Sequence, residues 1–202
     1  IVLYGIGWQT GDEILTCNLE HPALALAAKD LEARHGVVSR VVEVEPQAEE
    51  SEIIEAVIAG ITQKTRLIAL SHIQYSCGLV MPVRQITRIA HERDIPVLID
   101  GAQSVGHIAV DLESLRCDYF AFSGQKWLMG PQGTGGLYIR TGSSAPIHPL
   151  FLKDGAGDVL DGNLNPLSLT SQNPGLIAGF TEAVKLALEH GQRQIELHNM
   201  GL

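Results

Sequence analysis

The 202-residue chain has few basic residues, few cysteines and no long apolar run. Only 14 Lys and Arg stand against 23 Asp and Glu, so the formal net charge of −9 argues against nucleic acid or an anionic membrane as the main partner. No stretch reaches about 18 apolar residues, so no membrane span is expected. Three scattered cysteines, without a CxxC pair or a signal-peptide pattern, argue against a disulfide framework and indicate a reducing, cytoplasmic setting.

The histidines and cysteines also lack the spacing of metal ligands. HxxxH, HExxH and paired-cysteine patterns are all absent, so no metal site is predicted. We interpret Cys17, Cys77 and Cys117 as small buried hydrophobic residues. Hydrophobic residues make up 45% of the chain, as in ordinary globular proteins, which argues against disorder.

Short apolar runs alternate with amphipathic stretches. Strands are expected at 13–17, 39–44, 66–71, 96–100, 118–123 and 136–140, and helices at 21–35, 50–60, 83–93 and 177–190. The runs RLIALS and PVLID are apolar throughout, which is typical of strands covered on both faces. The pattern predicts an α/β fold, with helices in two layers around a mostly parallel sheet.

Chemically active side chains follow the ends of the predicted strands. In open α/β sheets, ligands bind beyond the carboxyl ends of the strands. These ends carry Glu20 and His21, Ser71 and His72, Asp100 and Gln103, and finally Ser123, Gln125 and Lys126. One edge of the sheet should therefore gather carboxylate, amide, hydroxyl, amine and imidazole groups.

Asp100 and Lys126 each allow two interpretations. A carboxylate that closes a buried strand needs donors or a cation, so Asp100 either caps the turn into residues 102–105 or faces a protonated ring nitrogen of a cofactor. Lys126 either reaches solvent or pairs with Asp100, or it is a desolvated, nucleophilic amine. Together they meet the needs of a pyridoxal phosphate site, in which the lysine forms a Schiff base and the aspartate keeps the ring protonated.

Two further features have a functional and a structural interpretation. The segment GPQGTGG at 130–136 suggests a phosphate loop, but a strand follows it instead of a helix, so a turn between strands is predicted. His21 either stacks on a flat ring or caps the helix that follows it.

The segment DGAQSVGHIAVDLESLRCDYFAFSGQKWLMGPQGTGGLYIR strongly resembles the class V aminotransferase group of fold type I pyridoxal phosphate enzymes. The likeness continues upstream through TRLIALSHIQYSCGLVMPV and GDEILTCNLEHPALA and spans roughly residues 1–140. The group includes cysteine desulfurases, C–S lyases that act on cysteine or cystine, and proteins similar to isopenicillin N epimerase. The resemblance implies the large domain of such an enzyme, a transferase or lyase that acts on a small amino acid.

The resemblance also implies roles for individual residues. Lys126 would be the Schiff-base lysine, Asp100 the partner of the pyridine nitrogen, and Gln103 a contact of the phenolic oxygen. His21 would stack on the ring and assist proton transfer, and Ser123 would bind the phosphate.

Three positions depart from the pattern of the family. Gln125 stands where desulfurases commonly have His; it can still donate to the phosphate but cannot carry charge. Tyr75 and Ser76 stand where many members have Asn. The stretch PLSLTS at 166–171 lacks the usual Arg and Glu, although Ser171 would replace a Thr that reaches the phosphate of the partner subunit in a homodimer.

Three regions are expected. Residues 1–140 would form the cofactor-binding large domain without its N-terminal part, 141–174 an irregular loop region near the dimer interface, and 175–202 a helix that leads to a C-terminal small domain. Because no initiator Met is present and the last residues continue a helical pattern, we expect an internal piece of a longer protein. The bond that is broken stays open between C–S lyase or desulfurase chemistry and aminotransferase or epimerase chemistry. A non-catalytic cofactor-binding relative, or a piece that is inactive without its missing segments, is the alternative.

Overall fold

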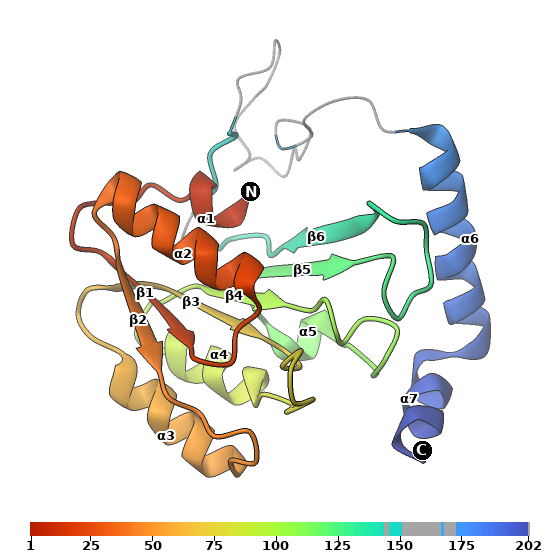
Figure 1. The fold of residues 1–202 in the computed structure, drawn as a ribbon, viewed down its shortest axis with the longest axis horizontal. Coiled ribbons are helices and arrows are strands. Elements are labelled where there is room, and N and C mark those ends of the chain that lie inside the picture. The colour runs from red at the N-terminus through yellow and green to blue at the C-terminus, as the bar shows by residue number, and fades with distance from the viewer. Residues whose placement is uncertain (144–145, 151–166, 168–172, 202) are drawn as a thin grey trace.

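The computed structural model describes residues 1–143, 146–150, 167 and 173–201. Within these residues, six strands form one sheet in the order β2-β1-β3-β4-β5-β6 (Figure 1). All neighbouring strands are parallel except β5 and β6, which are antiparallel. The strands are β1 Glu13–Cys17, β2 Val38–Val42, β3 Thr65–Ser71, β4 Val97–Asp100, β5 Tyr119–Ser123 and β6 Gly135–Ile139. The predicted α/β fold with a mostly parallel sheet is confirmed.

Helices cover both faces of the sheet (Figure 1). They are α1 Val2–Gly5, α2 Pro22–His35, α3 Glu50–Gly60, α4 Val83–His91, α5 Leu112–Leu115, α6 Pro174–His190 and α7 Gln192–Met200. Buried side chains of α1 and α2 belong to one hydrophobic cluster, and those of α3 and α4 belong to a second. Among the described residues, no helix is both long enough and apolar enough to span a bilayer.

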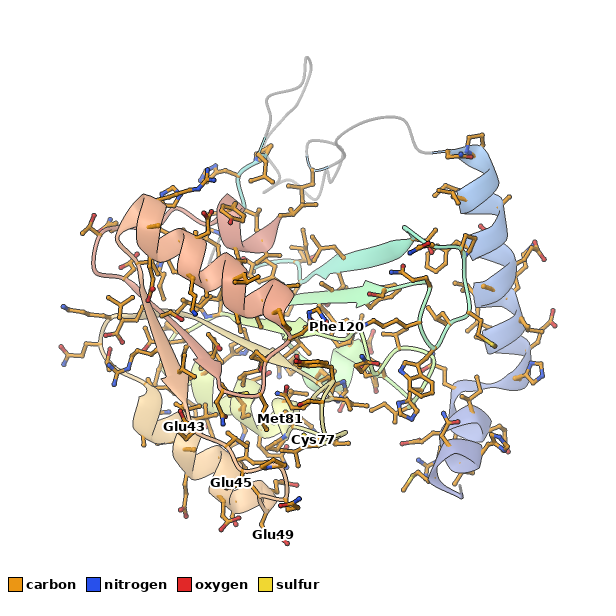
Figure 2. The ribbon with its side chains drawn as sticks, in the orientation of Figure 1. Glu43, Glu45, Glu49, Cys77, Met81 and Phe120 are labelled. Atoms are coloured by element: carbon orange, nitrogen blue, oxygen red, sulfur yellow. The ribbon has the colours of Figure 1, made fainter. Side chains whose placement is uncertain are left out.

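The central strands are buried because helices pack on both of their faces. On one side, Ile14 of β1 packs with Leu24 and Leu31 of α2. On the other side, Phe120 of β5 and Met81, both labelled in Figure 2, belong to the larger cluster. Burial of each such side chain contributes roughly 1.5–3 kcal/mol, so these two clusters hold the layers together.

The chain reverses its direction of travel across the sheet between β1 and β3. It leaves β1 through α2 to the edge strand β2, and then returns through α3 to β3 on the other side of β1. The carboxyl end of β1 leads to α2 and the carboxyl end of β3 leads to α4, and because these two helices lie on opposite faces, the connections diverge there. This divergence opens a crevice of the kind in which α/β proteins bind ligands.

Several predicted boundaries differ from the structure. β2 begins one residue earlier than predicted and lies at the sheet edge, which leaves Val38 44% and Val41 52% exposed. Helix α6 begins at Pro174, before the predicted start at 177, because the Asn173 side chain accepts a hydrogen bond from the Gly175 amide and Pro is favoured in the first turn. The predicted helix at 83–93 ends at His91. Most of the predicted loop region at 141–174 lies outside the described residues.

The prediction for the cysteines is wrong for one of the three. Cys17 and Cys117 are buried and free, as expected of small hydrophobic residues. Cys77 is free but exposed, because it lies in the loop between β3 and α4 (Figure 2). Cys77 therefore belongs to neither hydrophobic cluster.

A buried carboxylate fastens the amino ends of β4 and β5. Asp118 was predicted to open the strand, but β5 begins one residue later, and the fully buried Asp118 carboxylate accepts hydrogen bonds from the Val97 amide (2.8 Å) and Arg140 (2.5 Å). His91 Nε2 lies 2.8 Å from the same carboxylate. Burial by itself raises the pKa of Asp118, but the hydrogen bonds from His91, Val97 and Arg140 outweigh it and hold that pKa below its ordinary value.

We expect Asp118→Asn to lower the free energy of unfolding by about 3 kcal/mol at neutral pH. The NH2 group of the asparagine would face a hydrogen-bond donor where the carboxylate oxygen accepts a bond, and Arg140 would lose its charge partner. Since folding lowers the pKa of Asp118, its contribution is complete above about pH 4 and is lost as the pH falls through the folded value. Urea unfolding at several pH values measures both effects.

The matched control is Asp30→Asn, because Asp30 also pairs with an arginine, Arg34, but on the exposed surface. This variant should leave the urea midpoint almost unchanged. Two results would contradict the role given to the buried carboxylate. One is an equal loss of unfolding free energy in both variants, and the other is a difference between wild type and Asp118→Asn that does not become smaller at acidic pH.

Candidate functional site

A cavity of about 630 Å³ lies at the carboxyl edge of the sheet, on the face covered by α1 and α2. Its volume is within the range of small-molecule and cofactor sites. Six of the seven residues predicted to form the site line this cavity, namely His21, Asp100, Gln103, Ser123, Gln125 and Lys126. The seventh, Ser171, lies outside the described residues. Parallel strands therefore bring side chains from three separate parts of the sequence to one place.

Asp100 and Lys126 enter the cavity from the neighbouring strands β4 and β5. Lys126 follows β5 by three residues and is partly exposed, which agrees better with the interpretation that its amine reaches solvent than with that of a desolvated amine. Asp100 Oδ1 accepts a hydrogen bond of 2.9 Å from the Ala102 amide, which confirms that this carboxylate caps the turn. In the described part of the chain neither side chain has an ion-pair partner, so a charge of each sign faces the cavity without an opposite charge from the protein.

His21 caps the helix that follows it, as one of its two interpretations predicted. Its Nδ1 accepts a hydrogen bond of 3.1 Å from the Ala23 amide at the start of α2. Because Nδ1 is the acceptor, the neutral ring carries its proton on Nε2. The ring meets Tyr75 edge to face, with centroids 4.9 Å apart and planes at 77°. The cap thus fixes both the tautomer and the position of an imidazole at the cavity wall.

A second buried carboxylate, Glu20, ties the exits of β1 and β3 together. It accepts hydrogen bonds from the Ser71 amide (3.0 and 3.1 Å), the Ser71 hydroxyl (2.6 Å) and the Gln74 amide group (3.1 Å). The Cys17 thiol donates to it as well, over 3.2 Å. Burial, followed by the charge of Glu20, raises the pKa of Cys17, so this thiol stays protonated as a donor.

The Glu20 network holds His21 and Ser71, its neighbours at the cavity wall, in fixed positions. Sequence reasoning placed Glu20 at the sheet edge but missed this role. The available signal was that a carboxylate next to buried strands needs several donors.

His72 follows β3, but the structure buries it away from the cavity lining. Its ring meets Phe120 edge to face, with centroids 6.3 Å apart. Burial lowers the pKa of His72 to about 4, so the imidazole is neutral at physiological pH.

The loop after β5 carries the remaining polar groups. Ser123 ends the strand, and Gln125 and Lys126 follow in the turn. Residues 130–134 lead directly into β6, whose first residues are Gly135 and Gly136. The prediction of a turn between strands, and not a phosphate loop before a helix, is confirmed. In the described residues, no group of three or more His, Cys, Asp or Glu side chains is placed to hold a metal ion.

Comparison with known proteins gives this site a context. The family model for class V aminotransferases matches residues 1–201. A probable cysteine desulfurase of Methanothermobacter thermautotrophicus is 37% identical over 163 residues, which are 80% of this chain and 39% of that protein. The isopenicillin N epimerase of Amycolatopsis lactamdurans is 34% identical over 141 residues, 69% of this chain and 35% of that protein.

The fold matches solved structures of the cystine C–S lyase C-DES. In complex with its reaction product cysteine persulfide, C-DES has a TM-score of 0.83 and 31% identity, over 95% of this chain and 54% of that one. A lysine-to-alanine variant of C-DES, with glycine covalently linked to its PLP cofactor, has a TM-score of 0.84 and 29% identity, over 99% and 55% of the two chains. The chain thus spans about half the length of C-DES and less than half of the two sequence relatives.

Two variants separate the cap made by His21 from its imidazole ring. His21→Ala removes the acceptor for the Ala23 amide and should lower the free energy of unfolding by about 1 kcal/mol. His21→Asn supplies a good capping oxygen and should stay within about 0.5 kcal/mol of the wild type. Urea denaturation followed by circular dichroism measures both values, and an equal loss in the two variants would show that ring packing, not the cap, stabilises α2.

Proposed function

Because the chain belongs to the class V aminotransferase family, we propose that it binds pyridoxal phosphate in the cavity at the carboxyl edge of the sheet, with Lys126 as the residue that attaches the cofactor covalently. The observation that carries the proposal is that the Lys126 amine and the Asp100 carboxylate follow or end adjacent strands, line one cavity and have no ion-pair partner among the described residues. This arrangement suits a ligand that needs both a nucleophilic amine and a carboxylate.

The donor set of the cavity fits the cofactor. Asp100 uses Oδ1 for the turn, which leaves its second oxygen for a protonated ring nitrogen. Gln103 offers an amide group to the phenolic oxygen, and Ser123 and Gln125 offer donors to the phosphate. His21 offers the flat face of its ring. When bound, pyridoxal phosphate supplies an aldehyde that condenses with amines and a protonated ring that withdraws electrons from the substrate.

The protein groups then divide the work of binding and proton transfer. Asp100 holds the proton on the ring nitrogen, since an adjacent carboxylate favours the charged form of a base. With the cofactor bound, the Lys126 amine would take and return the proton at the substrate α-carbon. Positioned acid–base groups of this kind accelerate reactions by about 10²–10⁴-fold. His21 bears a proton on Nε2 and assists as a donor at the cavity wall.

For the substrate we propose a small sulfur-containing amino acid, cysteine or cystine, cleaved at a C–S bond. Support comes from C-DES, whose product is cysteine persulfide, and from the probable cysteine desulfurase. The epimerase relative keeps transamination and epimerisation as the alternative reactions. We also propose a homodimer completed by Ser171, as the resemblance to the family implies, and a cytoplasmic setting, as the cysteine content indicates.

A second candidate is a relative that binds the cofactor without catalysis. Gln125 favours it, because an amide cannot carry the charge of the histidine common at this position in desulfurases. Release of sulfide or persulfide from L-cysteine or L-cystine, measured on the protein loaded with cofactor, would exclude this candidate.

We expect borohydride reduction of the chain in the presence of pyridoxal phosphate to fix the cofactor on Lys126. Tryptic mass spectrometry should find the added mass on the peptide that contains Lys126, and Lys126→Ala should take up none. The matched control is Lys64→Ala, because Lys64 is an exposed lysine far from the cavity lining, and its loss should leave labelling unchanged. Labelling spread over surface lysines, or retained in Lys126→Ala, would contradict the assignment.

Asp100→Asn should leave the attachment to Lys126 intact but lower the rate of proton exchange at the substrate α-carbon by about 10²-fold or more, because the neutral amide does not hold the ring nitrogen protonated. Proton NMR of L-alanine or L-cysteine in D2O with the loaded protein measures this rate. An unchanged rate would place the ring nitrogen away from Asp100.

A further inference from the structure

The side chain of Gln103 is hydrogen-bonded to Trp127, the residue next to Lys126. The indole Nε1–H of Trp127 donates a hydrogen bond of 2.9 Å to Oε1 of Gln103. Gln103 and Lys126 both line the main cavity, whereas Trp127 does not. Trp127 therefore contacts Gln103 without lining the main cavity, and it lines a second cavity to which Gln103 and Lys126 also contribute.

This contact decides how the amide group of Gln103 is turned. An indole nitrogen is a donor only, so the group that meets it has to be the amide oxygen. The amide nitrogen takes the other position of the planar group. Among the described residues no protein acceptor meets it, so its two N–H donors remain for a ligand. Without the indole, the two orientations of the amide would compete.

The Trp127 ring is held in place by its neighbours, although the residue is 43% exposed. His107 stacks on it, with ring centroids 3.9 Å apart and planes within 13°. His107 Nδ1 in turn lies 3.2 Å from the backbone carbonyl oxygen of Gln103, so this nitrogen donates. The three residues form a closed cycle that begins and ends on Gln103.

The backbone is shaped to allow this cycle. Gly106 has a φ of +83°, and a Cβ added there would lie 2.7 Å from backbone atoms of Trp127 and Leu128. Only glycine lets the loop that carries Gln103 and His107 approach the loop that carries Trp127 so closely. Asn199 of α7 donates to the His107 carbonyl oxygen over 2.9 Å, which anchors the same loop from the other side.

We propose that Trp127 is a positioning residue, which orients the Gln103 amide so that its N–H donors face the oxygen of an aromatic hydroxyl group on the bound cofactor. The proposal rests on the proposed function, because it takes the ligand to be pyridoxal phosphate. Trp127 contributes through Gln103 alone, so removing the indole donor has an effect only while Gln103 is present.

The first test needs no cofactor. In a 15N–1H spectrum of the free chain, the two tryptophans give two indole signals. Gln103→Ala should shift the signal of Trp127 and leave that of Trp8, whose indole donates to the Leu3 carbonyl oxygen. Gln103→Glu keeps an oxygen acceptor and should retain a hydrogen-bonded Trp127 signal. If the chemical shift of the Trp127 indole signal is the same in Gln103→Ala as in the wild type, the contact on which the proposal depends is absent.

The second test is a double-mutant cycle on the dissociation constant of pyridoxal phosphate, measured by absorbance titration of the 202-residue chain. Trp127→Phe should weaken binding about fivefold, as the loss of one hydrogen bond does. Gln103→Ala should weaken it at least as much, and the double variant should equal Gln103→Ala. Gln103→Glu should also weaken binding, because it lacks the N–H donors, and Trp8→Phe should bind as the wild type does.

The outcomes separate this proposal from the function on which it rests. If the wild type binds the cofactor at Lys126 and Trp127→Phe binds equally well, the positioning role is wrong and the proposed function stands. If the effects of Trp127→Phe and Gln103→Ala simply add, Trp127 acts by another route and the proposal fails. If the wild type binds no cofactor, both fall. Urea midpoints within error of the wild type for each variant show that the comparison is between folded proteins.

Discussion

Parallel pairing of β1, β3, β4 and β5 is the constraint on which the site depends. Parallel strands end at the same edge of a sheet, so residues from His21 to Lys126 meet around one cavity although they are far apart in the chain. The divergence of α2 and α4 opens that edge, and the two hydrophobic clusters hold the helices in place. Stability and chemistry are thereby separated: apolar strand interiors hold the fold, and strand ends carry the polar groups.

Three carboxylates at strand ends show how partners set the role of a charged group. Asp118 is surrounded by His91, Arg140 and an amide, and Glu20 by amide, hydroxyl and thiol donors. Both are satisfied within the protein and serve the structure. Asp100 has one backbone donor and no described cation, so its remaining capacity faces the cavity. The incompletely satisfied carboxylate is the one available to a ligand.

The alternation of strands and helices, the edge of the sheet that carries the site and six of the site residues follow from local patterns. Buried strands such as RLIALS end in polar side chains, and the fold class sets the edge at which these side chains lie. The contacts that refine the site do not follow. Glu20 meets Ser71 and Trp127 meets Gln103 across 51 and 24 residues, and only the packed tertiary structure sets those pairings. The exposure of Cys77 and the partial exposure of Lys126 likewise depend on how the loops lie over the sheet. Hydrophobic periodicity does not predict the positions of loops.

The central claim is that one flat ring lies between Lys126 and Asp100. The cofactor is attached to Lys126, and the ring nitrogen faces Asp100. A crystal structure of the chain grown with pyridoxal phosphate tests it most directly. The account predicts continuous density from Nζ of Lys126 to the cofactor, and a ring nitrogen within hydrogen-bonding distance of an Asp100 oxygen. A cofactor bound outside this cavity, or bound in it with the ring nitrogen turned away from Asp100, would contradict the account.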